Sequence, residues 1–229
     1  MTSDAAQRRA ACASRWTMCS HEFAHALHGR CKVDRTPPAM PSPVQLIHPT
    51  RHGDARGWFT ETYNAERFAK LGIVCTFMQD NHSLSAQPHT LRGLHFQTPP
   101  HAQDKLVRCI RGRIFDVAVD VRNGSPTFGR WVGTELSAEN GDQLFIPAGF
   151  AHGFVTLEPQ CEVVYKCSAL YAPEHDGGII WDDPDIAIAW PIPVGAAPEL
   201  SAKDQRLPRL ASFESPFDYD GRPLEPLDQ

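Results

Sequence analysis

The chain has 229 residues, of which 41% are hydrophobic, and a formal net charge of −5 at pH 7. This composition supplies one sizeable core. The negative charge disfavours nucleic acid or an anionic membrane surface as a partner, because binding phosphates over a large area needs a basic field. No apolar stretch reaches the roughly 20 residues that cross a bilayer, and seven irregularly spaced cysteines favour reduced thiols and a cytoplasmic location.

Residues 1–43 differ from the rest of the chain. They contain six basic residues against three acidic ones, and they end in a proline-rich stretch over 36–43 that is typical of a linker. We expect residues 1–43 to be a poorly ordered extension, with Met40 as a candidate translation start. A single domain is expected over residues 44–229.

Within this extension, residues 21–25 read His-Glu-Phe-Ala-His and match the His-Glu-x-x-His pattern of zinc peptidases. In those enzymes both imidazoles bind zinc and the glutamate activates water. The glycine that usually follows the second histidine is missing here, and a short basic segment offers no domain that supplies a cleft. We therefore interpret the match as chance.

From residue 44 onward, short apolar runs are separated by Gly, Pro and Asn, which predicts a chain rich in β-strands. One helix is expected over residues 65–71. Asn64 is suited to cap its first turn, and Gly72 is suited to end it.

Residues 113–122 alternate between apolar and acidic side chains, which predicts a strand with one buried face. The apolar face consists of Phe115, Val117, Val119 and Val121, and the other face carries Asp116 and Asp120.

Another strand is expected over residues 161–171, where the odd-numbered residues share a face and Tyr165 and Tyr171 point the same way. Many short strands with little helix indicate a sandwich or jelly roll.

The spacing Gly141-x5-Pro147-x-Gly149-x2-His152 matches the second half-motif of cupin barrels, in which a tight corner aims the histidine into the barrel. Metal-binding cupins also need a His-x-His pair and a glutamate from the first half-motif, where this chain has only His95. One histidine from each half leaves too few ligands for a stable transition-metal site. We expect a pocket without metal or cofactor. The alternative for His152 is a core histidine bonded to a backbone carbonyl.

Several blocks together, including Leu-Arg-Gly-Leu-His-Phe-Gln at residues 91–97, resemble dTDP-4-dehydrorhamnose 3,5-epimerases. The blocks occupy residues 56–61, 79–83, 91–97, 102–108, 116–120, 136–140, 146–154, 165–168 and 200–204, and the resemblance covers about residues 44 to 210. It implies an all-β, cupin-type jelly roll with a few short helices, a homodimer, and no cofactor. It also implies a reaction in which a proton beside a ketone is removed, the charge moves to the carbonyl oxygen, and a proton returns from the opposite face.

The resemblance implies four catalytic residues. His95 is the base, Asp204 partners its other ring nitrogen, Lys105 stabilises the enolate oxygen, and Tyr165 returns the proton. Taken singly, a solvated lysine, a core tyrosine and a helix-capping aspartate are the simpler interpretations. Their joint occurrence at the family positions favours the catalytic roles.

The resemblance also implies a dTDP-sugar site. Cations are expected on the pyrophosphate, an aromatic ring on thymine, and polar groups on base, sugar or phosphate. The cations are Arg56, Arg92 and Lys203, and the stacking ring is Tyr171. The polar residues are Glu61, Gln79, Asn81 and Asp176, together with His152, which is expected to contact the substrate. Asp176 replaces a glutamate of several relatives, and Asp104 stands where many have glycine.

The implied reaction converts dTDP-4-dehydro-6-deoxy-D-glucose into dTDP-4-dehydro-L-rhamnose, for dTDP-L-rhamnose biosynthesis and so for lipopolysaccharide or cell-wall rhamnose. Two alternatives stay open. One is epimerisation at carbon 3 or 5 alone, or ketone migration, on a related dTDP-4-keto sugar. The other is a non-catalytic cupin that binds nucleotide sugars.

Overall fold

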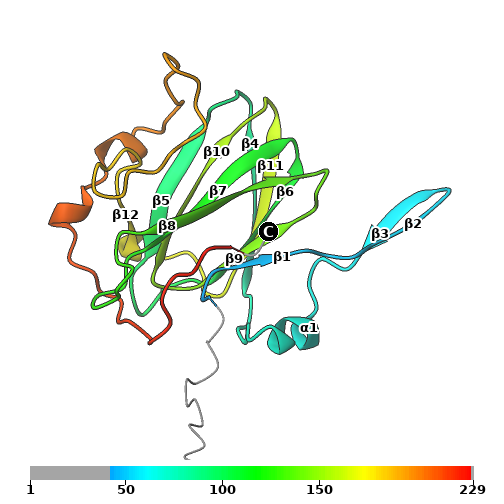
Figure 1. Ribbon diagram of the computed structural model, residues 1–229, viewed down its shortest axis with the longest axis horizontal. Coiled ribbons are helices and arrows are strands. Elements are labelled where there is room, and N and C mark those ends of the chain that lie inside the picture. The colour runs from blue at the N-terminus through cyan, green and yellow to red at the C-terminus, as the bar shows by residue number, and fades with distance from the viewer. Residues whose placement is uncertain (1–41, 228–229) are drawn as a thin grey trace, which may run out of the picture. The chain divides into compact units, whose positions relative to one another are not determined.

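The computed structural model describes residues 42–227 (Figure 1). The predictions for Met40 and for the His-Glu-x-x-His motif fall on residues 1–41 and lie outside the described residues. Within residues 42–227, none of the helices has the length and apolar character that a membrane span requires.

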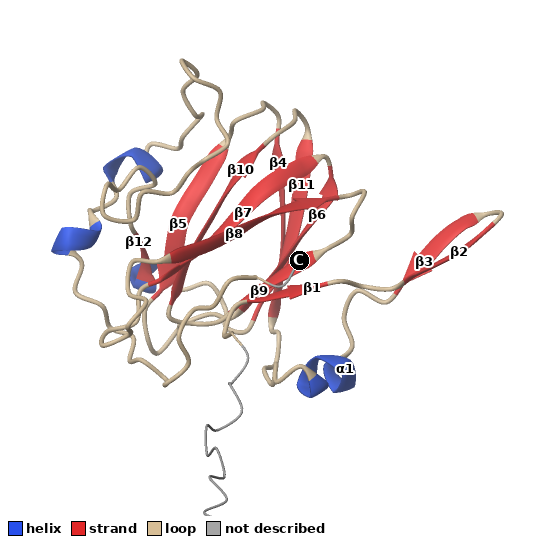
Figure 2. Cartoon of the chain, viewed as in Figure 1, coloured by secondary structure: helices blue, strands red, loops and turns tan. Residues whose placement is uncertain are grey.

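Two five-stranded antiparallel sheets pack face to face (Figure 2). In spatial order, the first sheet contains β1 (Gln45–Ile47), β9 (Gln143–Ile146), β6 (Lys105–Arg111), β11 (Cys161–Cys167) and β4 (Gln79–Ser85). The second contains β12 (Asp176–Gly178), β5 (Leu91–Gln97), β10 (Phe150–Thr156), β7 (Arg113–Asp120) and β8 (Trp131–Ser137). Sequence neighbours mostly lie in opposite sheets, so the expected jelly roll is confirmed.

The main core lies between the two sheets. Val107 and Leu144 of the first sheet meet Ile114 and Phe154 of the second sheet there, and all four side chains are buried. Burying each side chain of this size stabilises the fold by about 1.5–3 kcal/mol. The core fills only part of the space between the sheets, and residues of both sheets, including His95 and Tyr165, line cavities in the rest.

Strand β7 is confirmed, but the prediction that only one of its faces is buried is wrong. Val117 and Val119 pack under the later segment that contains Ile179 and Leu210, which covers the outer face of the second sheet. The opposite face of β7, with Ile114 in the main core, is buried as well. The aspartates on that face therefore point between the sheets and not into solvent.

The predicted helix is confirmed as α1 (Ala65–Lys70). The side chain of Asn64 accepts hydrogen bonds from the backbone N–H groups of Glu66 and Arg67 at 3.0 and 3.2 Å. Gly72 adopts a φ of +81°, a conformation that favours glycine and ends the helix.

Strand β11 ends at Cys167, four residues earlier than predicted. Cys161, Val163 and Cys167 are buried on one face, as their spacing predicts. Tyr171 lies beyond the strand, in a segment without regular structure that leads into the 3-10 helix η1 (Pro173–His175). The two tyrosines are therefore not neighbours on one strand face.

The remaining elements are peripheral to the sandwich. The hairpin of β2 (Arg51–Asp54) and β3 (Gly57–Thr60) projects beyond the sheets (Figure 1). Two further 3-10 helices, η2 (Asp204–Arg206) and η3 (Leu210–Ser212), belong to the segment that covers the second sheet.

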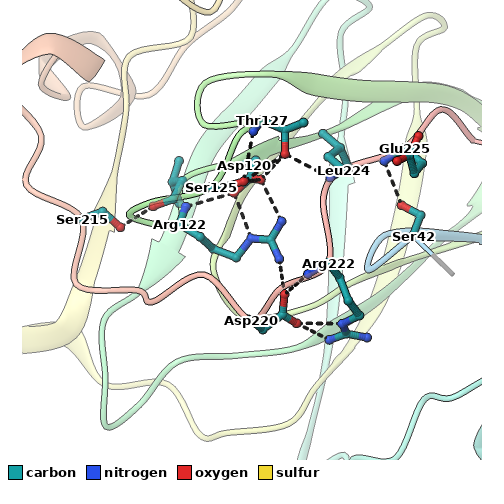
Figure 3. Close-up of polar contacts among 11 residues, drawn as sticks. Ser42, Asp120, Arg122, Ser125, Thr127, Ser215, Asp220, Arg222, Leu224 and Glu225 are labelled. Atoms are coloured by element: carbon teal, nitrogen blue, oxygen red, sulfur yellow. Dashed lines mark hydrogen bonds and ion pairs between the residues drawn. The ribbon is translucent and has the colours of Figure 1, made fainter. Parts of the chain in front are cut away.

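A buried ionic cluster joins the end of β7 to residues near the C-terminus (Figure 3). Asp120 accepts hydrogen bonds from the guanidinium of Arg122 at 2.9 and 2.8 Å and from the hydroxyls of Ser125 and Thr127, both at 2.7 Å. Arg122 also donates to Asp220 at 2.7 Å. We call these five residues the Asp120 cluster.

The Asp120 cluster explains the glycine of the corner before β10. Gly149 has a φ of +91°, and a Cβ atom at this position would lie 2.7 Å from Cγ of Arg122. The guanidinium of Arg122 lies 4.4 Å from the ring centre of Phe150, the first residue of β10. The corner that leads to His152 is thus packed tightly against the cluster.

Candidate active site

Two adjoining cavities of about 310 and 220 Å³ lie between the sheets and share His95, Lys105, Tyr165 and Lys203 in their walls. They bring together most of the residues selected from the sequence. Besides those four, the walls contain Gln79, Asn81, Arg92, His152, Tyr171, Asp176 and Asp204.

His95 and Asp204 form a hydrogen-bonded pair, although 109 residues separate them in sequence. His95 lies on β5, and Asp204 begins η2 with only 2% of its surface exposed. Nε2 of His95 lies 2.6 Å from Oδ1 of Asp204. Burial alone would raise the pKa of Asp204, but hydrogen bonds from His95 and Ser201 lower it overall. The ionised carboxylate therefore holds the proton on Nε2 and leaves Nδ1 able to accept one.

Lys105 is the first residue of β6, and its side chain is buried. Its Nζ donates to the backbone carbonyl of His95 at 3.4 Å. Burial lowers the pKa of Lys105, while Cys167 and Asp116 nearby act in the opposite direction. The ammonium group is thus held beside the histidine base in a site with little water, where its charge acts strongly.

Tyr165 lies on β11, opposite Asn81 of β4 and Val107 of β6. Burial raises the pKa of its phenol, so the hydroxyl stays protonated at neutral pH. Tyr165 belongs to the first sheet and His95 to the second, and both line the same two cavities. A base and a proton donor therefore approach the cavity from opposite sheets.

His152 has a carboxylate partner, so the alternative of a histidine bonded to a backbone carbonyl is wrong. Its Nε2 lies 2.8 Å from Oδ1 of Asp116, and both side chains are buried. Burial lowers the pKa of His152, and the neighbouring carboxylate opposes this shift. Because His152 and His95 are paired across β10 and β5, the two histidine–aspartate pairs lie side by side.

The sequence reasoning missed two residues of this site, Asp116 and Ser83. Within residues 42–227, Asp116 Oδ2 and Ser83 Oγ are the buried side-chain polar atoms without a hydrogen-bond partner. Ser83 lines the smaller cavity, and Asp116 holds His152. Both residues therefore belong to the site through direct contact with the cavity or with His152, which lines it. No signal in the sequence indicated Asp116, because the alternation over residues 113–122 put it on the face opposite the predicted buried one.

The mouth of the cavity carries charged and aromatic groups. Asp176 Oδ2 accepts hydrogen bonds from Nζ of Lys203 and, at 3.2 Å, from the hydroxyl of Tyr171. Asp176 therefore contacts both the cation and the aromatic residue expected to bind the nucleotide. Tyr171 is 57% exposed, so its ring is open to a ligand. Arg92 donates to the carbonyl oxygen of Leu84 at 3.2 Å.

Two predicted binding residues do not line the cavity of their own chain. Arg56 lies at the turn of the β2–β3 hairpin and pairs with Asp54. Glu61 follows β3 and pairs with Arg67 at 3.0 Å. Neither residue is in the wall of either cavity, and the hairpin that carries Arg56 projects beyond the sheets (Figure 1).

Asp104, the acid that precedes Lys105, faces the corner before β10. Its Oδ1 accepts a hydrogen bond from the backbone N–H of Ala148 at 2.9 Å. Over residues 42–227 the structure contains no cluster of three or more His, Cys, Asp or Glu side chains that could hold a metal ion. For proton transfer, the cavity walls offer a base, an ammonium, a phenol and a second histidine.

Comparisons with known proteins identify the family of this chain. Residues 42–212 match the family described as dTDP-4-dehydrorhamnose 3,5-epimerase. The chain is 53% identical to the dTDP-4-dehydrorhamnose 3,5-epimerase of Sinorhizobium fredii over 176 residues, which span 77% of this chain and 89% of that relative.

Solved structures are similar as well. The dTDP-6-deoxy-D-glucose-3,5-epimerase of Legionella pneumophila, in complex with dTDP-4-keto-L-rhamnose, is 46% identical with a TM-score of 0.71, covering 75% of this chain and 90% of that one. A 3'-monoepimerase from Streptomyces bikiniensis, in complex with dTDP-quinovose, is 36% identical with a TM-score of 0.70, covering 76% and 87%.

Proposed function

Because the chain belongs to the dTDP-4-dehydrorhamnose 3,5-epimerase family of isomerases, we propose that it converts dTDP-4-dehydro-6-deoxy-D-glucose into dTDP-4-dehydro-L-rhamnose. The observation that carries this proposal is the placement of His95, paired with Asp204, and Tyr165 in one cavity but on opposite sheets. Inverting a carbon beside a ketone requires a base on one face and a proton donor on the other.

The reaction begins at His95. Nδ1 takes the proton from the carbon next to the ketone, and the electron pair of the broken C–H bond moves onto the carbonyl oxygen as an enolate. The Asp204 carboxylate fixes the tautomer of His95 and stabilises the imidazolium that forms. A positioned base of this kind increases the reaction rate by a factor of about 10²–10⁴.

Lys105 stabilises the enolate oxygen. Its ammonium is buried beside the strand that carries His95, so it is in place before the negative charge develops. Preorganised charge of this kind is usually the largest single contribution to catalysis. The side chains of this chain are sufficient for enolate chemistry, and the proposal requires no cofactor.

Tyr165 completes the inversion by donating its phenolic proton to the opposite face of the same carbon. The raised pKa of Tyr165 supports this role, because the hydroxyl is protonated when the enolate forms. The phenol then regains a proton from solvent, and the His95 imidazolium releases the proton it took to solvent, so both groups are restored. The same sequence at the second carbon gives the doubly inverted product.

The mouth of the cavity suits the nucleotide part of the substrate. Arg92 and Lys203 are proposed to bind the pyrophosphate, Tyr171 to stack on thymine, and Gln79 and Asn81 to contact base or sugar. His152 is proposed to contact the sugar, and Asp176 to hold Lys203 and Tyr171 in place.

We propose a homodimer in which the β2–β3 hairpin of one subunit reaches the cavity of the partner subunit. Three features support this arrangement. The hairpin projects from its own sandwich, it exposes Trp58 and Phe59, and it carries Arg56 with Glu61 close behind. In a dimer, these two side chains would meet the nucleotide that binds to the partner.

We also propose that the enzyme acts in the cytoplasm and supplies dTDP-L-rhamnose for lipopolysaccharide or cell-wall synthesis. The free thiols of Cys75, Cys109, Cys161 and Cys167 support a reducing compartment. Double epimerisation is favoured over the action of a monoepimerase, because sequence identity is higher to the 3,5-epimerases than to the 3'-monoepimerase.

Solvent-proton exchange tests the proposal. Incubating dTDP-4-dehydro-6-deoxy-D-glucose with the protein in deuterated water should place deuterium at carbons 3 and 5, detected by mass spectrometry and NMR. Label at one carbon would identify a monoepimerase. The His95→Ala variant should bind dTDP and introduce no label. A wild-type protein that binds dTDP without any exchange would instead be a nucleotide-sugar binding cupin.

A further inference from the structure

Residues 169–172, which we call the mouth segment, join β11 to η1 without regular secondary structure. Each of these four residues nevertheless has a backbone group bonded to a glutamine side chain. Gln103 donates to the Ala169 carbonyl at 2.8 Å, Gln97 donates to the Leu170 carbonyl at 3.2 Å, Gln79 accepts from Tyr171 N–H at 2.9 Å, and Gln97 accepts from Ala172 N–H at 2.8 Å.

The three glutamines come from different parts of the fold. Gln79 begins β4, Gln97 ends β5, and Gln103 lies in the connection before β6. All three line the larger cavity. The mouth segment is therefore fixed to strands of both sheets by side chains that belong to the cavity wall.

Gln97 is the most constrained of the three. It is 4% exposed, and both the oxygen and the nitrogen of its amide are hydrogen-bonded. Besides its two bonds to the mouth segment, Nε2 donates to the backbone carbonyl of His101 at 2.7 Å. A buried amide with one acceptor and two donor bonds allows a single arrangement of the chain around it.

The residue held in this way is Tyr171. Its ring is more than half exposed, so packing alone does not fix it, and its hydroxyl has one tether, to Asp176. Ordering an exposed aromatic side chain and its loop on binding costs affinity, and holding them in place beforehand avoids that cost.

We propose that Gln97 and Gln103 are positioning residues, which hold the mouth segment so that Tyr171 is ready to stack on the base of the nucleoside diphosphate. The two glutamines set the affinity for the nucleotide through Tyr171 and take no part in proton transfer. This inference rests on the proposed function, specifically on Tyr171 as the stacking residue.

The test replaces the amide donors by carboxylates of the same shape, in Gln97→Glu and Gln103→Glu, in the full-length protein. The carboxylate oxygens then face backbone carbonyls. Calorimetry with dTDP should show a Kd about tenfold higher for Gln97→Glu and about threefold higher for the more exposed Gln103→Glu. KM for the dTDP-sugar should rise in parallel, while kcat should fall by less than about threefold.

A double-mutant cycle with Tyr171→Ala separates a positioning role from a merely structural one. If the glutamines act through Tyr171, Gln97→Glu should cost no further dTDP affinity in the Tyr171→Ala background. The same loss in both backgrounds would overturn the inference. So would an unchanged Kd with a lowered melting temperature, which would show a structural role only.

Two controls keep the outcome clear. Gln160→Glu changes a glutamine that also donates to a loop carbonyl, that of Ala86, but at the opposite end of β11, and it should leave the Kd for dTDP unchanged. If Gln97→Glu does not fold, Gln103→Ala tests the same role with a smaller disturbance. If Tyr171→Ala alone leaves dTDP affinity unchanged, the stacking role fails and this inference fails with it. If only the glutamine variants have no effect, the inference fails alone.

Discussion

Asp116 and Asp120 stand four residues apart on β7, and both are 0% exposed, yet their surroundings differ. Asp120 accepts hydrogen bonds from Arg122, Ser125 and Thr127, and both of its oxygens are used (Figure 3). Asp116 has one partner, His152, and its Oδ2 has none. Both oxygens of Asp120 are hydrogen-bonded within the protein, whereas only one oxygen of Asp116 is.

This contrast distinguishes a structural charge from a functional one within a single strand. A buried network whose members are all bonded makes one arrangement rigid. Asp116, by contrast, is bonded to His152, whose side chain lines the cavity. We infer that the Asp120 cluster holds the chain together and that Asp116 serves the cavity through His152.

The largest expected effect is on folding, from Asp120→Asn. The change should lower the free energy of unfolding by about 3–5 kcal/mol, because it leaves Arg122 buried without its main counter-charge. Urea denaturation followed by fluorescence measures this loss. The rate of deuterium exchange per folded molecule should stay within about twofold of wild type.

The control is Asp220→Asn, which removes the exposed partner of the same arginine and should cost no more than about 1 kcal/mol.

The pH dependence of the free energy of unfolding tests the same role of Asp120. Burial would raise the pKa of Asp120, but the hydrogen bonds from Arg122, Ser125 and Thr127 lower it overall. The stability difference between wild type and Asp120→Asn is therefore fully present above the ordinary aspartate pKa and is lost as pH falls through the lower folded-state value.

A smaller effect, on catalysis, is expected from Asp116→Asn. The amide oxygen can still accept from His152 but carries no charge, so we expect the exchange rate to fall about tenfold. The free energy of unfolding should change by less than about 1 kcal/mol, since only one bond to Asp116 is at stake. A loss of stability as large as that of Asp120→Asn would show that the two aspartates play the same role.

The smallest effect expected is a shift in the pH dependence of the rate. Burial lowers the pKa of Lys105, so kcat should decline with rising pH below the ordinary pKa of lysine, as the ammonium is lost. The Tyr165 phenol has a raised pKa and does not account for this decline. Lys105→Arg should move the decline to higher pH, because a guanidinium stays charged. A decline at the same pH in both proteins would assign it to another group.

The sequence was sufficient for the fold class and for most of the cavity. Asn64 and Gly72 act locally, and local signals of this kind predict a helix and its ends. The alternation over 113–122 likewise gave a strand in the right place. His95, Lys105, Tyr165 and Asp204 were selected by resemblance, and their proximity is a property of the folded chain.

Other features depend on contacts that periodicity does not encode. The valines of β7 were expected to face the only core, but a later segment covers them, so the aspartates point between the sheets. Strand β11 ends at Cys167, and the backbone after it accepts hydrogen bonds from Gln103 and Gln97, which lie far away in the sequence. The pattern of residues 161–171 contains no signal for these contacts. Periodicity also did not predict that the hairpin carrying Arg56 projects beyond the sheets, or that Arg56 and Glu61 are absent from the cavity walls.

The bond between His95 and Asp204 gives the enzyme an unusual point of failure. His95 lies in a sheet, whereas Asp204 lies on η2, in the segment that covers the second sheet. Between the last strand and η2 the chain forms a loop that contains the fully exposed Val194. Both sheets are complete before that loop begins. A protease that cuts in this loop would leave both sheets assembled, but Asp204 would be held less firmly against His95. Catalytic activity therefore depends on the packing of this segment against the second sheet. After cleavage of the loop, activity would fall before the β-sheet content does.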